Sequence, residues 1–173
     1  MSEFGKIPET NLFESILQKY GEDVKRLIFL YVKNITVTDD LWQEVFIKIY
    51  NNLERYENKS SIKTWIYQIA INQCRDYFRS WHRTKVVLGD FVDRQSTSSV
   101  EEIVVKGDES IFIAKKVLSL SIKYREVIIL FYYKELKVKE VSSILNLNES
   151  TVKTRISRGR DLLRKKLGGV DLE

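Results

Sequence analysis

The sequence contains 173 residues, of which 43% are hydrophobic and 31% are charged, and its formal net charge at pH 7 is +5. This composition is typical of a soluble chain that folds into one domain or two small ones, and it excludes disordered and membrane-embedded proteins. With one proline and seven glycines, the chain also lacks the turn residues that a β-sandwich or a barrel needs.

The single cysteine, Cys74, and the single histidine, His82, restrict the chemistry that the chain can perform. They exclude an intramolecular disulfide, a cysteine-cluster metal site and any multi-histidine metal cage. No apolar run follows a positive flank near the N-terminus, and no window approaches about 18 uncharged apolar residues. We therefore expect a cytoplasmic protein with no signal peptide, no metal and no cofactor.

Helical spacing of apolar residues dominates the first block of the chain, which we place at residues 7–84. A first helix is predicted from about residue 12, with Gly21 as its stop signal, and a second apolar segment covers residues 24–35. In front of a third helix, over residues 41–53, Asp39 and Asp40 are predicted to act as a cap and as first-turn acids. Two adjacent apolar rows mark this third helix, namely Leu41, Val45, Ile49 and Leu53 in one and Trp42, Phe46 and Tyr50 in the other.

A fourth helix is predicted over residues 62–78, and either Ser60 or Ser61 can cap it. Aromatic and basic side chains alternate along it, which is a pattern typical of proteins that bind unpaired bases and their backbone. Trp65 and Tyr77 also belong to its apolar stripe, so packing in the core is the alternative role for both.

Residues 85–110 lose this periodicity and are predicted to form a flexible linker. The stretch contains the polar run 95–99, and its acids outnumber its bases. A short helix near residues 100–105 is an alternative for part of this stretch. A flexible segment of roughly 25 residues spans tens of ångströms, so two domains joined by it could act at separate sites.

The second block, residues 111–168, ends in a helix-turn-helix pattern. A short helix is predicted over residues 138–145, and Asn146 then occupies the position where helices end in a left-handed residue. Asn148 follows as the expected N-cap of a longer helix from Glu149 to about Leu167. In this motif the second helix lies in the DNA major groove.

The charge of the last helix and the distribution of its apolar and polar residues between two faces agree with DNA binding. Val152, Ile156 and Leu163 form an inward stripe, whereas hydroxyl and basic side chains lie on the other side. Residues 134–166 contain ten bases and four acids, a local charge of +6. A basic helix face alone is usually only a solvated surface. The turn, the cap, the inward stripe and the basic outer face together favour DNA binding.

The segments 39–50, 63–79, 124–127, 139–141 and 151–160 form three motifs. These motifs closely resemble those of the extracytoplasmic-function (ECF) sigma factors of the sigma-70 family. The segments 124–127 (Tyr-Arg-Glu-Val), 139–141 and 151–160 resemble the domain that reads the promoter −35 element. Residues 39–50 resemble the helix that binds core RNA polymerase, and residues 63–79 resemble the segment that reads and melts the −10 element. The fold class expected from this reading is all-α, with an N-terminal helical bundle, a flexible linker and a C-terminal helix-turn-helix domain.

The resemblance implies one set of site residues for each step. The residues implied to bind core polymerase are Asp40, Gln43, Glu44, Phe46, Ile47 and Lys48. Those implied to bind or melt −10 DNA are Lys63, Trp65, Asn72, Arg75, Asp76 and Arg79. Those implied to bind −35 DNA are Lys139, Ser150, Thr151, Lys153, Thr154, Arg155 and Arg158. The partners implied are core RNA polymerase, promoter DNA and an anti-sigma factor, for which a membrane-bound protein is one option, with no small-molecule substrate.

Two other functions start from the same residues. A DNA-binding regulator that is not a polymerase subunit would carry the same helix-turn-helix, but its first block would need a ligand pocket or a dimer surface. A partner-regulated interaction module is compatible with the sigma-factor reading. Catalysis is not expected, because the chain has no glycine-rich phosphate loop, no nucleophile elbow and one histidine.

Overall fold

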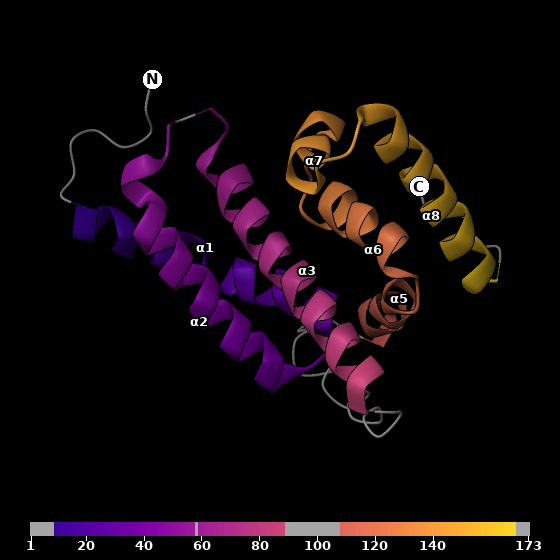
Figure 1. The fold of residues 1–173 in the computed structure, drawn as a ribbon. Coiled ribbons are helices and arrows are strands. Elements are labelled where there is room, and N and C mark those ends of the chain that lie inside the picture. Colours follow the sequence, from indigo (N-terminus) through magenta and orange to yellow (C-terminus); the bar gives the residue numbers. More distant parts are fainter. Residues whose placement is uncertain (1–8, 58, 89–107, 169–173) are drawn as a thin grey trace. The chain divides into compact units, whose positions relative to one another are not determined.

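The computed structural model describes residues 9–57, 59–88 and 108–168, and all regular structure within them is helical. The all-α prediction is therefore confirmed. The chain divides into two compact units, Met1–Gln95 and Ser96–Glu173 (Figure 1). Within the described ranges, no helix is both long and apolar enough to cross a membrane.

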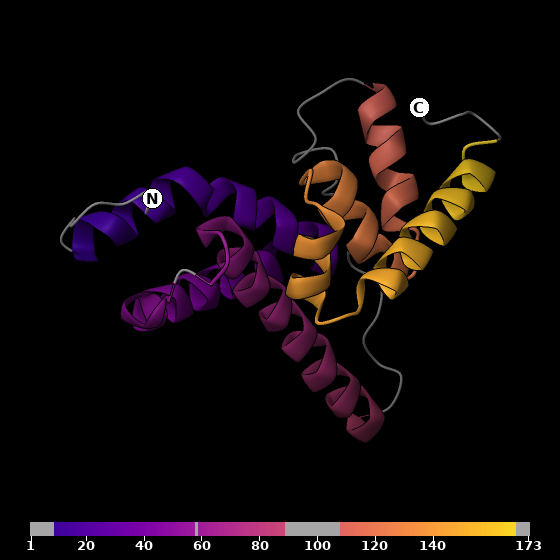
Figure 2. The same cartoon turned by 90° about the horizontal axis from the view of Figure 1, so that it is seen from above.

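In its described residues the first unit has the helices α1 (Glu9–Val32), α2 (Ile35–Asn52) and α3 (Ile62–Leu88), with a short 3-10 turn, η1 (Leu53–Arg55), after α2. Each of the three helices packs against the other two, as the two views in Figures 1 and 2 show. Their shared core consists of fully buried apolar side chains, among them Ile16, Leu27, Ile28, Val45, Ile49, Ile66 and Ile71. Residues 85–88 of the predicted linker belong to α3, and residues 108–110 belong to α5 (Asp108–Leu118). The rest of that stretch, including the short helix considered near residues 100–105, lies outside the described residues.

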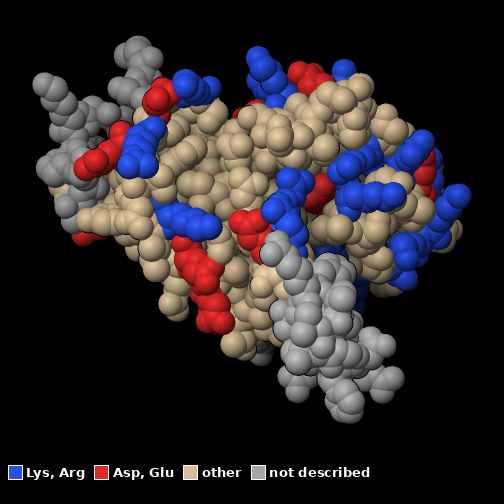
Figure 3. All heavy atoms as spheres, viewed as in Figure 1, with Lys and Arg blue, Asp and Glu red and all other residues tan. Residues whose placement is uncertain are grey.

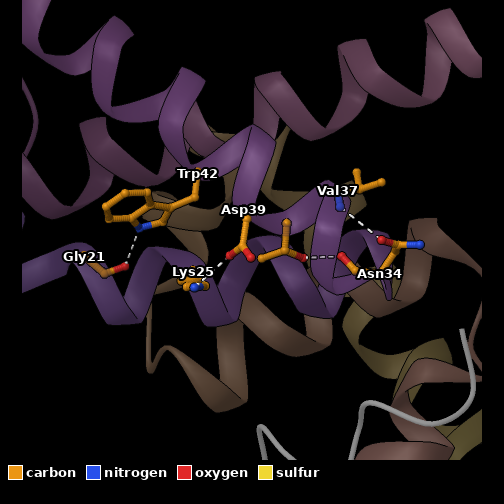
Figure 4. A network of polar contacts seen from close by, with 7 residues as sticks. Gly21, Lys25, Asn34, Val37, Asp39 and Trp42 are labelled. Carbon is orange, nitrogen blue, oxygen red and sulfur yellow. Dashed lines mark hydrogen bonds and ion pairs between the residues drawn. The ribbon is translucent and has the colours of Figure 1, made fainter.

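The connection between α1 and α2 differs from the sequence prediction. Lys33 takes a left-handed conformation, and Asn34 then caps α2 by accepting a hydrogen bond from the Val37 amide at 3.0 Å (Figure 4). The predicted cap at Asp39 and Asp40 is therefore wrong, because α2 begins several residues earlier. Asp39 instead forms an ion pair with Lys25 of α1 at 2.7 Å, and this hydrogen bond raises the pKa of the Lys25 ammonium.

The helix α1 also continues through Gly21, where the sequence predicted a stop. Gly21 is buried, and its carbonyl accepts a hydrogen bond from the Trp42 indole of α2 at 2.9 Å (Figure 4). Glycine lowers helix stability by about 1 kcal/mol, but packing against a second helix readily offsets a cost of that size. The predicted cap of α3 is confirmed at Ser61, whose hydroxyl oxygen accepts from the Thr64 amide at 3.1 Å.

The second unit contains the predicted helix-turn-helix. Between residues 108 and 168 it has the helices α5 (Asp108–Leu118), α6 (Ile122–Ile128), a π-helical continuation η2 (Ile129–Tyr133), α7 (Val138–Leu145) and α8 (Glu149–Lys166). Asn146 has a φ of 53°, and the Leu147 amide donates back to the Ser142 carbonyl at 3.1 Å. Asn148 caps α8 by accepting from the Thr151 amide at 2.8 Å. The sequence prediction is confirmed at both positions.

Gly159 lies where α8 packs tightly against α6. A Cβ atom at this position would lie 2.9 Å from Cγ1 of Ile128, whereas a Cβ at Gly21 would meet nothing nearer than 3.7 Å. We expect Gly159→Ala to destabilise the second unit by about 1 kcal/mol, because overpacking outweighs the gain in helix propensity. Gly21→Ala is the matched control and should stabilise the first unit by about 0.5–1 kcal/mol. Urea unfolding of both variants tests this, and a stabilised Gly159→Ala would show that the two helices can move apart.

Candidate functional site

Four of the predicted polymerase-binding residues form one exposed strip on α2. Asp40, Gln43, Glu44 and Ile47 follow the i, i+3, i+4, i+7 spacing of a single helix face, and all four are exposed. Ile47 is 59% exposed, which is unusual for a large aliphatic side chain in a folded unit. Tyr50, 57% exposed, extends this strip, although the sequence analysis placed it in an apolar row. An apolar centre with a polar rim is the usual layout of a protein–protein interface.

Phe46 and Lys48 do not belong to this strip. Phe46 is 4% exposed and packs its ring against Trp42 at 4.8 Å and Phe13 of α1 at 6.3 Å, both measured between ring centroids. Its predicted role as a direct polymerase contact is corrected, because the side chain lies beneath the strip rather than on it. Lys48 lies on the α3 side of α2, where its ammonium donates to the side-chain carbonyl of Gln73.

Gln73 connects α2 to α3 through both ends of its amide. Its oxygen accepts from Lys48, and its nitrogen donates to Glu44, while the side chain itself is 9% exposed. These two partners fix which way the amide points, because only the oxygen can accept from an ammonium. The buried amide of Gln73 thereby fixes the positions of Glu44 and Lys48 relative to each other.

On α3, four of the six predicted −10 residues share one face. Trp65, Asn72, Asp76 and Arg79 recur at helical spacing, and all but Trp65, which is half-buried, are exposed. Arg79 and Asp76 form an exposed ion pair at 3.4 Å, which contributes little stability and leaves the guanidinium accessible.

The other two predicted residues, Lys63 and Arg75, lie off this face. The Lys63 ammonium lies 5.7 Å from the ring centroid of Tyr67, a buried residue whose hydroxyl donates to Asp23 of α1. Lys63 is therefore on the α1 side of α3. Arg75 is half-buried to one side of the row.

A hollow of about 370 Å³ lies beside this α3 face. It is lined by Lys48, Asn52, Arg55, Trp65, Ile69 and Asn72. The Trp65 ring packs against the ring of Tyr56, at 5.0 Å between ring centroids. An aromatic wall, amide groups and two cations suit an unstacked base with its charged backbone. The sequence analysis missed Asn52 and Arg55, because Asn52 is the last residue of α2 and Arg55 lies in η1, where periodicity gives no signal.

On α3, Cys74 is buried and Tyr77 is half-buried. Cys74 is 1% exposed, and burial raises the pKa of its thiol to about 12, so the thiol stays neutral. Burial also raises the pKa of the Tyr77 hydroxyl. The buried, neutral Cys74 therefore acts in packing. The side chain of His82 lies outside the described residues.

The first half of α8 presents most of the predicted −35 residues to solvent. Ser150, Lys153, Thr154 and Arg158 are exposed, and Thr151 is half-buried. Lys139 is exposed on α7, the helix that in this motif crosses the DNA backbone. Figure 3 shows lysine and arginine side chains gathered over the surface that α8 contributes.

Arg155 differs from the other predicted DNA contacts. Its guanidinium forms an ion pair with Glu126 of α6 at 3.0 Å, with side-chain exposures of 27% and 5%. The pair fixes α8 to α6, so the structure gives Arg155 a role in holding the recognition helix. The sequence offered no sign of this, because the partner is 29 residues away along the chain.

The first unit is a helical bundle with an exposed strip on α2 and a polar and aromatic hollow beside α3, and the second unit is a basic helix-turn-helix. Together these features are typical of a two-part DNA-binding protein with a protein-docking face. Sigma-70 region 2 matches residues 16–84, and sigma-70 region 4 matches residues 113–163. The ECF RNA polymerase sigma factor SigW of Bacillus subtilis (strain 168) is 32% identical over 169 residues, which cover 92% of this chain and 90% of SigW. The chain belongs to the ECF sigma factors of the sigma-70 family, which direct RNA polymerase to specific promoters.

Two solved structures share the fold. The sigma factor RpoE of Bartonella quintana, in complex with the anti-sigma factor NepR, has a TM-score of 0.80 at 22% identity, covering 92% of this chain and 98% of that one. CnrH, in complex with the cytosolic domain of CnrY, has a TM-score of 0.69 at 20% identity, covering 94% and 91%. The family assignment makes the chain a transcription initiation factor and replaces the alternative of a regulator outside the polymerase.

Proposed function

We propose that the two units of this sigma factor divide promoter recognition, with domains at residues 7–84 and 111–168 and a linker at 85–110. The α2 strip binds core RNA polymerase, the α3 face with its hollow takes up −10 DNA as it opens, and α8 reads the −35 element. The observation that carries this proposal is that three different helices present three surfaces. They are the exposed α2 strip with Ile47 at its apolar centre, the hollow walled by Trp65 of α3, and the basic helix α8 capped by Asn148.

Reconstitution with core RNA polymerase tests the proposal. Purified full chain plus core enzyme should start transcripts from a limited set of genomic templates, and mapping their starts should reveal shared −10 and −35 elements. Core enzyme without the chain is the control. Failure to initiate on any template, with tight duplex binding by the chain alone, would contradict the proposed division.

We further propose that an anti-sigma factor holds this chain inactive by covering the same exposed apolar surface on α2. Ile47 and Tyr50 leave an apolar patch in water that a partner would bury favourably. RpoE bound to NepR and CnrH bound to the cytosolic domain of CnrY support this proposal by analogy. A membrane-bound partner with a cytosolic domain would fit an initiation factor that works in the cytoplasm.

Strand opening should depend on the α3 face more than closed-complex formation does. We expect Asn72→Ala and Arg79→Ala each to slow opening about 3–10-fold, because each removes a hydrogen bond or phosphate contact made with the opened strand. Permanganate reactivity of unpaired thymines measures opening, and gel shift measures closed complexes.

The exposed residue Gln18 of α1 provides a matched control for Asn72, since Gln18→Ala removes an amide that does not line the hollow. A template with a preformed bubble should restore initiation by both α3 variants. Equal defects in opening and in closed-complex formation would mean that the two residues only support the fold.

A further inference from the structure

A second hollow, of about 290 Å³, lies between α6 and the first half of α8. It is lined by Lys123, Tyr124, Ser150, Thr151, Thr154, Arg155 and Arg158. Hydrogen-bond donors and cations dominate this lining, and none of these seven residues carries a carboxylate. Such a lining suits an oxyanion, because each hydroxyl, ammonium and guanidinium can donate to an acceptor that has no hydrogen of its own.

Lys123 is the lining residue that the helix-turn-helix pattern does not include. It is exposed on the first turn of α6, and its ammonium lies 4.9 Å from the ring centroid of Tyr124, which also lines the hollow. The cation–π contact keeps the charge beside the hollow. Because Lys123 precedes α8 by more than twenty residues, sequence spacing alone gave it no role.

The two arginines of the hollow are used differently. Arg155 is turned to Glu126, with which it forms its ion pair at 3.0 Å. Arg158 is exposed one turn further along α8. The charges directed to an incoming anion are therefore those of Lys123 and Arg158, which come from two different helices.

We propose that this hollow binds one backbone phosphate of the upstream promoter element, with Lys123 and Arg158 supplying the charge and Thr151 and Thr154 the hydroxyls. Lys123 is then a DNA contact outside the helix-turn-helix, and α6 helps to fix the register of α8 in the groove. Phosphate contacts position a protein on DNA without reading its sequence. This inference rests on the proposed role of α8 in −35 binding.

Salt dependence of DNA binding tests the charge of Lys123. The probe is a promoter duplex bound by core polymerase carrying the full chain, titrated over a range of KCl concentrations. Lys123→Gln should make the slope of log affinity against log salt shallower by about 0.9, and by the same amount on duplexes with altered −35 letters. Lys115→Gln, at an exposed lysine of α5 outside the hollow, is the control and should leave the slope unchanged.

Neutral backbone substitution tests the site itself. Methylphosphonates are placed one at a time through the upstream element. At one position the substitution should weaken binding of the unaltered chain but leave the affinity of Lys123→Gln unchanged. An unchanged slope together with full sensitivity at every position would overturn the proposal. If millimolar inorganic phosphate at constant ionic strength competes in a Lys123-dependent way, the hollow is a small-anion site, and the backbone assignment is wrong.

The two proposals fail in distinguishable ways. Should the polymerase carrying this chain select no promoter, the division of promoter recognition fails. The salt dependence of binding can then still be measured with the full chain alone on a duplex of arbitrary sequence, and Lys123→Gln should still make its slope shallower.

Discussion

Phe46→Ala is expected to lower the free energy of unfolding of the first unit by about 3–5 kcal/mol, the usual cost of emptying a buried phenylalanine site. The side chain is 4% exposed and contacts the rings of Trp42 and Phe13, so its loss leaves a cavity between α1 and α2. Urea unfolding followed by circular dichroism measures the change.

The neighbouring residue on α2 should behave in the opposite way. Ile47 is 59% exposed, so Ile47→Asp should change stability by no more than about 0.5 kcal/mol. The affinity of the Ile47→Asp variant for core RNA polymerase should fall about 10–100-fold, because an aliphatic contact is replaced by a charge in the interface. If Ile47→Asp binds polymerase normally, the strip is not the docking face. If it unfolds, the side chain packs in a way that its exposure does not show.

Arg155→Ala is expected to destabilise the second unit by about 2–4 kcal/mol, since it leaves the carboxylate of Glu126 buried without its cation. Glu126 is 5% exposed, and the Nη1 atom of Arg155 donates to its Oε1 at 3.0 Å. Arg158→Ala, at an exposed position of the same helix, should change stability by no more than about 0.5 kcal/mol while weakening binding of the −35 element. Both variants should still bind core polymerase.

A double substitution separates the ion pair from the surrounding packing. Arg155→Met combined with Glu126→Gln removes both charges and should recover much of the stability that Arg155→Ala loses. Thermal unfolding of the unaltered protein, of Arg155→Met and Glu126→Gln alone, and of the double variant completes the cycle. Equal stability of Arg155→Ala and Arg158→Ala would contradict the assignment of Arg155 to the α6–α8 contact.

Local signals in the sequence predicted the helix-turn-helix correctly. Asn146 and Asn148 determine the end of α7 and the start of α8 through their own backbone and side-chain geometry, so no distant residue is needed. The predicted start of α2 was wrong because two local cap signals compete there. Asn34 competes with Asp39 as a cap, and the left-handed Lys33 that favours Asn34 has no sequence signature.

Periodicity predicted the site residues less well, because it assigns a face and not a depth. Phe46 and Ile47 are adjacent in sequence, yet one is buried and the other is exposed. Arg155 and Arg158 both read as outward cations, but a carboxylate on another helix holds only Arg155. Both hollows join side chains from separate elements, so Arg55 and Lys123 became visible only in the fold.

The burial of Cys74 has a consequence for how such a factor could be induced. Oxidants react with the thiolate form of cysteine, and a thiol with a pKa of about 12 and 1% exposure offers almost none of it. Cys74 is the only cysteine of the chain. Folded sigma factor should therefore be insensitive to peroxide at this residue, and a redox stimulus would have to be sensed by a separate molecule that then releases it.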